Sequence, residues 1–204
     1  MNIGMIDASI QAENRTKRGV ALHEAGHFAV ARSVGFQVLG LKVSRDRPRS
    51  EYHSGSAHIS IISPIADDRE LENYLRARIM VLLAGGLAQA FDGATWDERR
   101  LCQIRADNAS DDMSKARELF ALHLNRRIAL GEDLAYAESN KWESHPFWQQ
   151  CEEESRTTLK NQWEAIRRIS DDIETEVHRD CYNYDPPIER ILAIGWPNEG
   201  TLTG

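Results

Sequence analysis

The stretch from Val20 to Arg32, VALHEAGHFAVAR, contains the pattern H-E-x-x-H. On an α-helix, residues four apart lie on one face about one turn from each other, so His23 and His27 can direct imidazole nitrogens at the same metal ion. Glu24 lies roughly 100° further round the helix, where its carboxylate can reach a metal-bound water without being a third ligand. A carboxylate in that place can act as a general base. The pattern is typical of zinc hydrolases.

The residues around the motif favour a metal site over a chance match. Val20, His23, His27, Val30 and Val34 recur at helical spacing, which predicts that both histidines lie on a buried face. One histidine on such a face is commonly a core residue. Two histidines with an acid between them are costly to bury unless something pairs with them. A bound cation would supply that partner.

Composition excludes several classes of protein. The 204 residues suffice for one core with a helical appendage, and a net charge of −7 leaves no basic surplus for a nucleic acid partner. Three separated cysteines (Cys102, Cys151 and Cys181) without a C-x-x-C pattern indicate a reducing compartment. Residues 1–18 lack the apolar segment of a signal peptide, and the longest apolar run, residues 79–91, is too short and too polar to span a bilayer. We therefore expect a cytoplasmic protein without a membrane partner.

The rest of the chain predicts a mainly α fold (α+β), with a small β-hairpin or sheet after the motif helix. Periodicity and capping signals predict these elements: a helix from Asn14 or Thr16 to about Val34, ended by Gly35; strands at Phe36–Ser44 and Ser56–Ser63; a helix from Asp67 or Asp68 to about Phe91; an irregular segment or short helix within 92–107; and a helix opened by Asn108–Asp112 that runs to about Arg127.

The C-terminal part is helical and charged, with an apolar stripe at three-and-four spacing that comprises Leu159, Trp163, Ile166, Ile169, Ile173 and Val177. The simplest interpretation is a long helix packed on the body of the chain. The alternative is a seam for a partner helix or a homo-oligomer. We expect a zinc peptidase-like core over residues 1–131, a helical extension over 132–184 and a tail over 185–204.

A third metal ligand is expected near the start of the helix that follows Asn108. Both Asp111 and Asp112 can serve as capping residues that interact with the helix dipole. Asp112 shares a face with Ala116 and His123, so it is expected to point inward, where a metal ion would remove the cost of burying its charge. His53 and His58 lie in or beside the second strand, without a partner at ligand spacing, and we expect structural roles for them.

Three separated motifs together resemble the protease domain of the FtsH-type AAA zinc proteases. They are His23–Ala29 (HEAGHFA), Val81–Gln89 (VLLAGGLAQ) and Asn108–Met113 (NASDDM), and the resemblance covers roughly residues 16–127. In that family a site of two histidines and one aspartate binds zinc and hydrolyses peptide bonds. The family's aspartate falls on Asp112, which the resemblance therefore implies as the third ligand.

The sequence departs from this family at several points. Leu87 and Gln89 replace an arginine and a glutamate, which puts the groups that support the metal ligands in question. The family's asparagine–aspartate pair is Asp111-Asp112 here, so either carboxylate could serve. The chain has no G-x-x-x-x-G-K-[ST] motif and therefore no expected ATP site. The resemblance implies a stand-alone peptidase domain without an ATPase module or a membrane anchor.

The expected function is that of a zinc metalloendopeptidase acting on peptides or on unfolded and flexible proteins without ATP. His23, His27 and Asp112 would hold zinc, whose bound water would have a pKa near ~7 and lose its proton to Glu24. Glu24 would then pass that proton to the leaving amine.

Other interpretations remain open at the level of sequence. One is a non-catalytic zinc-binding interaction or regulatory module on the same fold, and another is a regulator that cleaves a single partner protein. A glutamate ligand from the helix after Asp67, such as Glu70 or Glu72, is an alternative to Asp112. The longer H-E-x-x-H-x-x-G-x-x-H pattern is excluded, because Val30 and Ser33 occupy its glycine and histidine positions.

Overall fold

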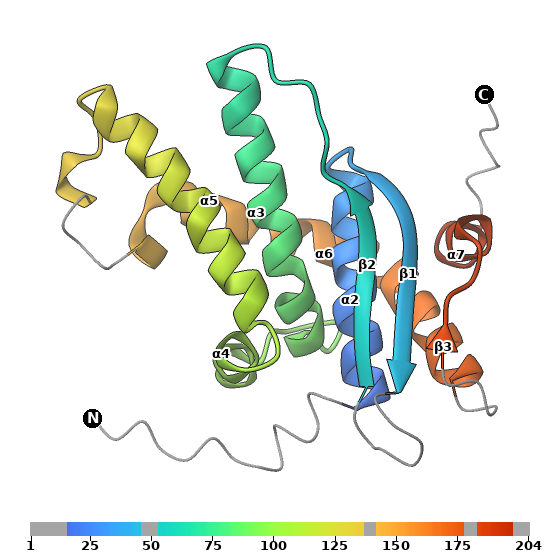
Figure 1. Cartoon of the computed structure of the whole chain (residues 1–204). Helices are drawn as coiled ribbons and strands as arrows, with labels where there is room; N and C mark the ends of the chain where they lie inside the picture. The colour runs from blue at the N-terminus through green and yellow to red at the C-terminus, as the bar shows by residue number, and fades with distance from the viewer. Residues whose placement is uncertain (1–15, 46–52, 137–141, 178–182, 198–204) are drawn as a thin grey trace.

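The computed structural model describes residues 16–45, 53–136, 142–177 and 183–197, and their fold is mainly helical with one small antiparallel sheet, as predicted (Figure 1). Its elements are α2 (Lys17–Ser33), β1 (Gln37–Arg45), β2 (His53–Ser60), α3 (Asp68–Ala90), α4 (Glu98–Ala106), α5 (Ser110–Ala129), the short 3-10 helices η1 (Leu134–Tyr136) and η2 (Trp142–Ser144), α6 (Pro146–Glu176), β3 (Asn183–Tyr184) and α7 (Ile188–Gly195). Our expectations for Asn14, for Cys181 and for the end of the tail lie outside the described residues.

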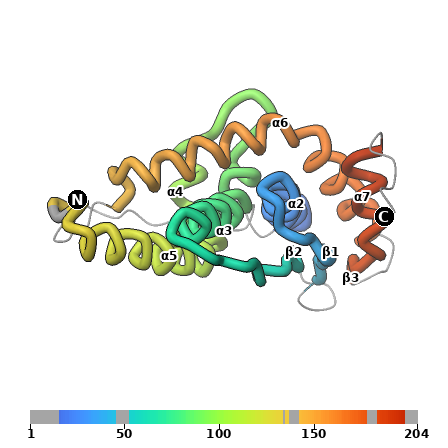
Figure 2. The backbone as a smooth tube through the Cα atoms, turned by 90° about the horizontal axis from the view of Figure 1, so that it is seen from above, coloured from blue at the N-terminus to red at the C-terminus, as the bar shows by residue number. Residues whose placement is uncertain are grey.

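Helix α2 is the central element of the fold. The Thr16 hydroxyl accepts a hydrogen bond from the Gly19 amide (3.2 Å) and caps the helix, and Gly35, with φ +89°, follows its end. Every residue from Gly19 to Ala31 is buried, which includes His23 and His27 as predicted and also the rest of the helix circumference. Figure 2 shows the reason, because α3, α6 and the sheet surround α2.

The sheet has the strand order β2-β1-β3 and is antiparallel throughout. Strand β2 begins and ends three residues earlier than expected, because its partner β1 pairs with it from Arg45 opposite His53 to Gln37 opposite Ser60. Pairing with β1 therefore includes polar residues at the start of β2, where the sequence has no alternation of apolar residues that would predict a strand. Strand β3 was not predicted, and its two residues pair with Val43 and Ser44. Strand β2 lies at the edge of the sheet.

Helices α3 and α5 lie beside α2 and bring later parts of the chain to it. The Asp67 carboxylate accepts a hydrogen bond from the Glu70 amide (2.8 Å) and caps α3, and the second half of that helix, residues 79–90, is buried without interruption. Helix α5 begins after Ala109, which offers no side-chain cap, and Asp111 and Asp112 lie in its first turn. Helix α4 lies in the segment 92–107, for which the sequence predicted either an irregular conformation or a short helix.

Helix α6 packs its apolar stripe against α2 and α3, as the simplest interpretation of the stripe predicted. The segment expected as a tail contains helix α7, whose Ile191 is fully buried. The Arg168 guanidinium on α6 donates hydrogen bonds to the carbonyl oxygens of Ile194 (3.0 Å) and Gly195 (2.7 Å), the last residues of α7. No helix in the described ranges is long and apolar enough to cross a membrane.

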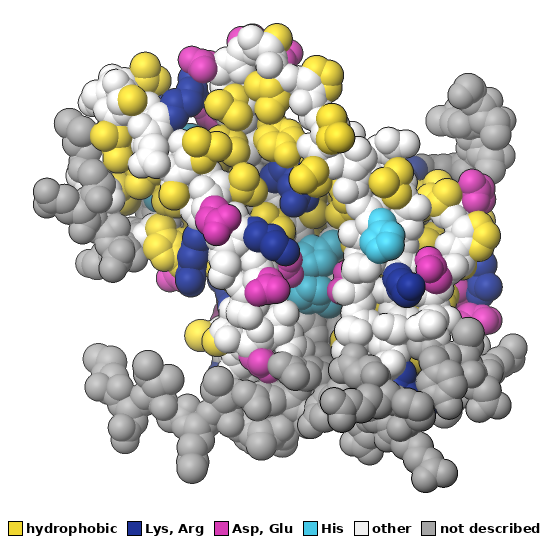
Figure 3. Space-filling model, in the orientation of Figure 1, with side chains coloured by type: hydrophobic (Ala, Val, Ile, Leu, Met, Phe, Trp, Pro, Cys, Tyr) yellow, Lys and Arg dark blue, Asp and Glu magenta, His cyan; other side chains and the backbone are white. Residues whose placement is uncertain are grey.

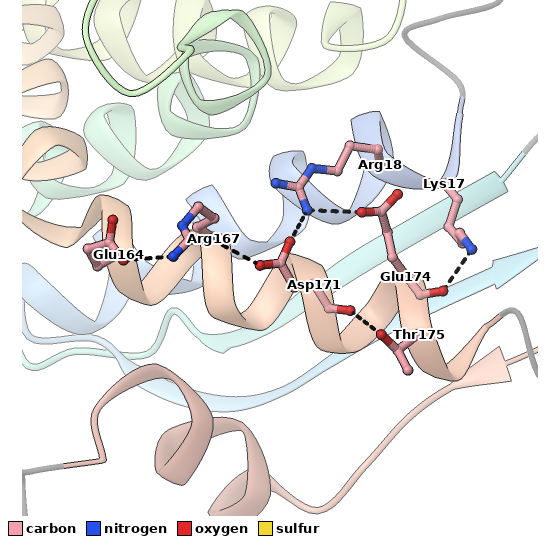
Figure 4. A network of polar contacts seen from close by, with 7 residues as sticks. All are labelled: Lys17, Arg18, Glu164, Arg167, Asp171, Glu174 and Thr175. Atoms are coloured by element: carbon pink, nitrogen blue, oxygen red, sulfur yellow. Dashed lines mark hydrogen bonds and ion pairs between the residues drawn. The ribbon is translucent and has the colours of Figure 1, made fainter.

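Polar contacts join the beginning of α2 to the end of α6 (Figure 4). Arg18 pairs with Asp171 and with Glu174 (3.0 Å), and Lys17 Nζ donates to the Glu174 carbonyl oxygen (2.7 Å). Exposed ion pairs of this kind contribute at most about 1 kcal/mol each. Burial of α2, more than this network, therefore holds the central helix in place.

Gly26 is the point of closest approach between α2 and α3. A Cβ atom at Gly26 would lie 2.6 Å from the Ala88 Cβ and 2.9 Å from the Ala84 carbonyl oxygen. Only glycine permits this contact, which explains a residue that disfavours a helix by about 1 kcal/mol relative to alanine.

We expect Gly26→Ala to lower the free energy of unfolding by about 1–2 kcal/mol, because the strain of forcing α2 and α3 apart exceeds the gain in helix propensity. Urea denaturation measures this change. Gly40→Ala is the control, because a Cβ at Gly40 would meet no atom within 4 Å. A Gly26→Ala protein as stable as the wild type would contradict the close contact.

Candidate metal centre

Three side-chain atoms from two helices converge at the centre of the molecule. His23 Nε2 lies 2.9 Å from His27 Nε2, and Asp112 Oδ2 lies 3.1 Å from the first and 3.2 Å from the second. Among the described residues, these three form the one group of histidine, cysteine and carboxylate side chains with metal-ligand proximity. The structure therefore brings together the three residues that the sequence suggested as ligands.

The other nitrogen of each imidazole determines which atoms face the centre. His27 Nδ1 donates a hydrogen bond to the Val81 carbonyl oxygen (2.6 Å), and His23 Nδ1 donates one to Gln89 Oε1 (2.9 Å). In the neutral rings both hydrogens are thus on Nδ1, and both Nε2 atoms present lone pairs. Two lone pairs and a carboxylate oxygen about 3 Å apart repel one another unless a positive charge lies among them.

A zinc ion fits this set of atoms. Zinc prefers imidazole nitrogen and carboxylate oxygen at about 2.0–2.1 Å in tetrahedral geometry, which separates its ligands by about 3.3 Å. The observed separations of 2.9 to 3.2 Å are close to that value. Acceptors on the far side of metal-bound imidazoles are also the usual arrangement, because they fix the orientation of the ring.

The electrostatics of the cluster likewise favour a cation. Burial lowers the pKa of His27, but the charges of Asp112 and Glu24 outweigh this and raise it to about 9. Burial raises the pKa of Asp112, but the neighbouring His27 and His23 outweigh burial and hold that pKa well below its usual range. A proton bound here is strongly retained, and a metal ion would have to displace it.

Helix α5 directs only one of its two N-terminal aspartates at the centre. Asp112 lies in the first turn and faces α2 with a side chain that is 18% exposed, whereas Asp111 is exposed. The helix dipole also favours a carboxylate at this end of α5. The structure thus decides between the two carboxylates that the sequence left open.

The remaining candidates lie elsewhere. Glu70 accepts a hydrogen bond from the Ala66 amide (2.7 Å), and Glu72 lines a separate cavity beside His123. His58 Nε2 lies 3.0 Å from Ser56 Oγ on β2. His53 is buried and lines a neighbouring hollow to which Glu24 also contributes, outside the group formed by His23, His27 and Asp112.

A cleft of about 360 Å³ opens above the cluster. Its floor comes from α2 and its walls from β2, α3 and the start of α5, and Figure 3 shows histidine side chains at this hollow. Glu24 lines the cleft beside the two histidines and is 7% exposed. Its Oε1 lies close to Gly55, where a Cβ atom would be only 2.9 Å away. Glycine in β2 therefore leaves room for this carboxylate.

Helix α3 supplies groups whose role the sequence did not reveal. Gly85 faces the imidazoles so closely that a Cβ there would lie 2.5 Å from His27 Nε2 and 2.6 Å from His23 Nε2. The departure at Gln89 leaves a hydrogen-bond acceptor beside His23, and Leu87 is buried in the core. No sequence signal identified the Val81 carbonyl, because any residue offers that group.

No protein-family model matches the sequence, and no curated protein matches it. The resemblance to the FtsH-type proteases therefore stays a prediction carried by the three motifs.

We expect the purified protein to bind about one zinc ion per chain and to lose it in His23→Ala and in Asp112→Ala, because each variant removes one of three converging ligands. Elemental analysis measures the metal content. Asp111→Ala is the matched control and should keep zinc. If zinc were retained in Asp112→Ala but lost in Asp111→Ala, the third ligand would be Asp111, and the assignment of Asp112 would be wrong.

We expect Gly85→Ala to abolish zinc binding while α3 stays folded, because the added methyl group would occupy the space of the Nε2 atoms. Gly86→Ala should bind zinc normally, since its Cβ would meet Ile104 at an ordinary 3.4 Å. Zinc titration and circular dichroism compare the two. Equal zinc affinity in both variants would show that the space at Gly85 is not needed.

Proposed function

We propose that this protein is a zinc metallopeptidase that hydrolyses peptide bonds in peptides or in unfolded and flexible proteins without ATP. The observation that carries the proposal is the convergence of His23, His27 and Asp112 on one point at the floor of an open cleft, with Glu24 beside them. The three-motif resemblance to the FtsH-type proteases supports the same activity.

The chemistry follows from the positions of the side chains. Zinc bound at this site would acidify a water molecule and polarise the carbonyl group of the bond to be cleaved. Glu24 would accept a proton from the attacking water on its carboxylate and deliver it to the nitrogen of the leaving amine. Gln89 and the Val81 carbonyl would keep both imidazoles in the orientation that binding requires.

The cleft suits a substrate in extended conformation. Edge strand β2 forms one wall through Gly55, Ala57 and Ile59, so a peptide could add to the sheet as a further strand. The segment after β2 is held by the Tyr74 hydroxyl, which donates a hydrogen bond to the Ile61 carbonyl oxygen (2.9 Å). A bound peptide would then pass directly over the metal ligands.

The alternative is a non-catalytic zinc-binding interaction or regulatory module. Structural zinc sites are usually closed by four protein ligands, whereas catalytic sites have three and leave one position open. Three ligands beneath a cleft, with a carboxylate that is not itself a ligand, favour catalysis. We further propose that the protein acts in the cytoplasm, since its cysteines show no disulfide pattern.

We expect Glu24→Gln to keep zinc and to lower kcat on an unfolded protein such as reduced casein by at least about 100-fold, because the amide cannot accept the proton. Glu72→Gln is the control. It removes a carboxylate of α3 that lies outside the cleft and should retain activity. Peptide release measured with zinc-loaded proteins tests both variants. Full activity in Glu24→Gln would contradict the role of Glu24 as the general base.

A further inference from the structure

The face of α3 that lines the cleft carries a guanidinium group away from the metal ligands. Gly85, Leu82 and Arg78 recur at spacings of three and four and so share one side of the helix. Gly85 lies against the imidazoles, Leu82 forms an apolar wall, and Arg78 lines the outer part of the cleft. Seven residues of helix place Arg78 about 10 Å from Gly85 along the axis.

Arg78 forms no ion pair with another described residue, and the carboxylate charge that acts on it is that of Asp112. Its guanidinium carbon lies 5.8 Å from the centre of the Phe36 ring. The neighbouring Arg76 pairs instead with Glu72 and Glu154. Burial lowers the pKa of Arg78, so its charge is held where water compensates it incompletely. A partly buried cation that no described residue holds in an ion pair, in the wall of a cleft, is suited to bind an anion.

The wall formed by α5 adds to the positive charge. Lys115 on α5 lines the same cleft, one turn beyond Asp112, and is exposed. The cleft is therefore acidic around the metal ligands and basic further out. On the face shown in Figure 3, dark-blue basic side chains adjoin the histidines of the hollow.

We propose that Arg78 binds a carboxylate group of the substrate, about three residues from the bond that is hydrolysed. An extended peptide advances about 3.3 Å per residue, so three residues span the roughly 10 Å between the two ends of this α3 face. This inference rests on the proposed function and names its substrate class: acidic peptides rather than peptides in general.

The carboxylate has two possible sources, an acidic side chain or the free C-terminus of the substrate. Strand β2 runs from Gly55, beside Glu24, towards Ile59 and the outer part of the cleft. A peptide that pairs antiparallel to β2 runs the other way, which puts residues N-terminal to the cleaved bond beside Arg78. With antiparallel pairing, only an acidic side chain can supply the carboxylate that Arg78 binds. Parallel pairing would instead bring the C-terminal part of the peptide, and so its free carboxyl group, beside Arg78.

The test uses peptides built on a casein site that the zinc-loaded protein cleaves. The first pair carries Asp or Asn at the third residue before the cleaved bond, and the second pair carries Asp or Asn at the third residue after it. The third pair ends at the third residue after the bond, with either a free or an amidated carboxyl group. We expect about a tenfold higher kcat/KM for the charged member of one pair. The pair that shows the preference identifies the source of the carboxylate.

Variants then assign the preference to Arg78. Arg78→Ala should lose it and still cleave the neutral peptide, and Arg78→Glu should reverse it in favour of a lysine peptide. Arg69→Ala is the control, because Arg69 is exposed on the same helix and does not line the cleft. Equal cleavage within every pair, or a preference unchanged in Arg78→Ala, would overturn the inference and leave the hydrolytic activity intact.

If no casein site is cleaved, the proposed hydrolysis fails, and binding of casein-derived peptide pairs that differ only by Asp or Asn decides on Arg78 separately. Fluorescence anisotropy with zinc-loaded Glu24→Gln protein measures it. If the charged peptide binds more tightly than the neutral one, and this difference is lost in the double variant with Glu24→Gln and Arg78→Ala, recognition of a carboxylate by Arg78 is supported. Equal binding of charged and neutral peptides overturns it.

Discussion

The close packing of α2 against α3 is the constraint on which the candidate metal centre depends. Gly26 lets the two backbones approach, with room for no more than a hydrogen atom at its α-carbon. At that separation the Val81 carbonyl reaches His27, and Gln89 reaches His23. The absence of a side chain at Gly85 leaves space for the two Nε2 atoms. A single helix contact thus sets the orientation of both imidazoles and leaves their Nε2 atoms directed at Asp112.

Burial makes the polar groups of α2 interdependent. The helix is enclosed on all sides from Gly19 to Ala31, so its histidines and Glu24 depend on protein partners or on the cleft for their interactions. Each imidazole is satisfied by α3 on one nitrogen and meets Asp112 on the other. The result is a cluster whose charges balance only with a proton or a metal ion at its centre.

Local signals predicted most of the helices. Thr16 and Gly35 mark the bounds of α2, and Asp67 marks the start of α3, because capping requires only neighbours in sequence. Long-range pairing explains the misses. Strand β2 is shifted by its ladder with β1, and α7 forms in a proline-containing segment because Arg168 of α6 satisfies its last carbonyls. A capping partner 26 residues away cannot be inferred from local sequence.

By itself, the sequence determined that His23 and His27 lie on one face of a helix with Glu24 beside them, because the spacing of an α-helix is fixed by its backbone. It also pointed to Asp112 through the apolar face of its helix. Only the tertiary structure chose Asp112 over Asp111, brought it to the histidines across 85 and 89 residues, and placed Gly85 and Arg78 along one cleft. These features arise from the packing of helices distant in sequence, which periodicity does not specify.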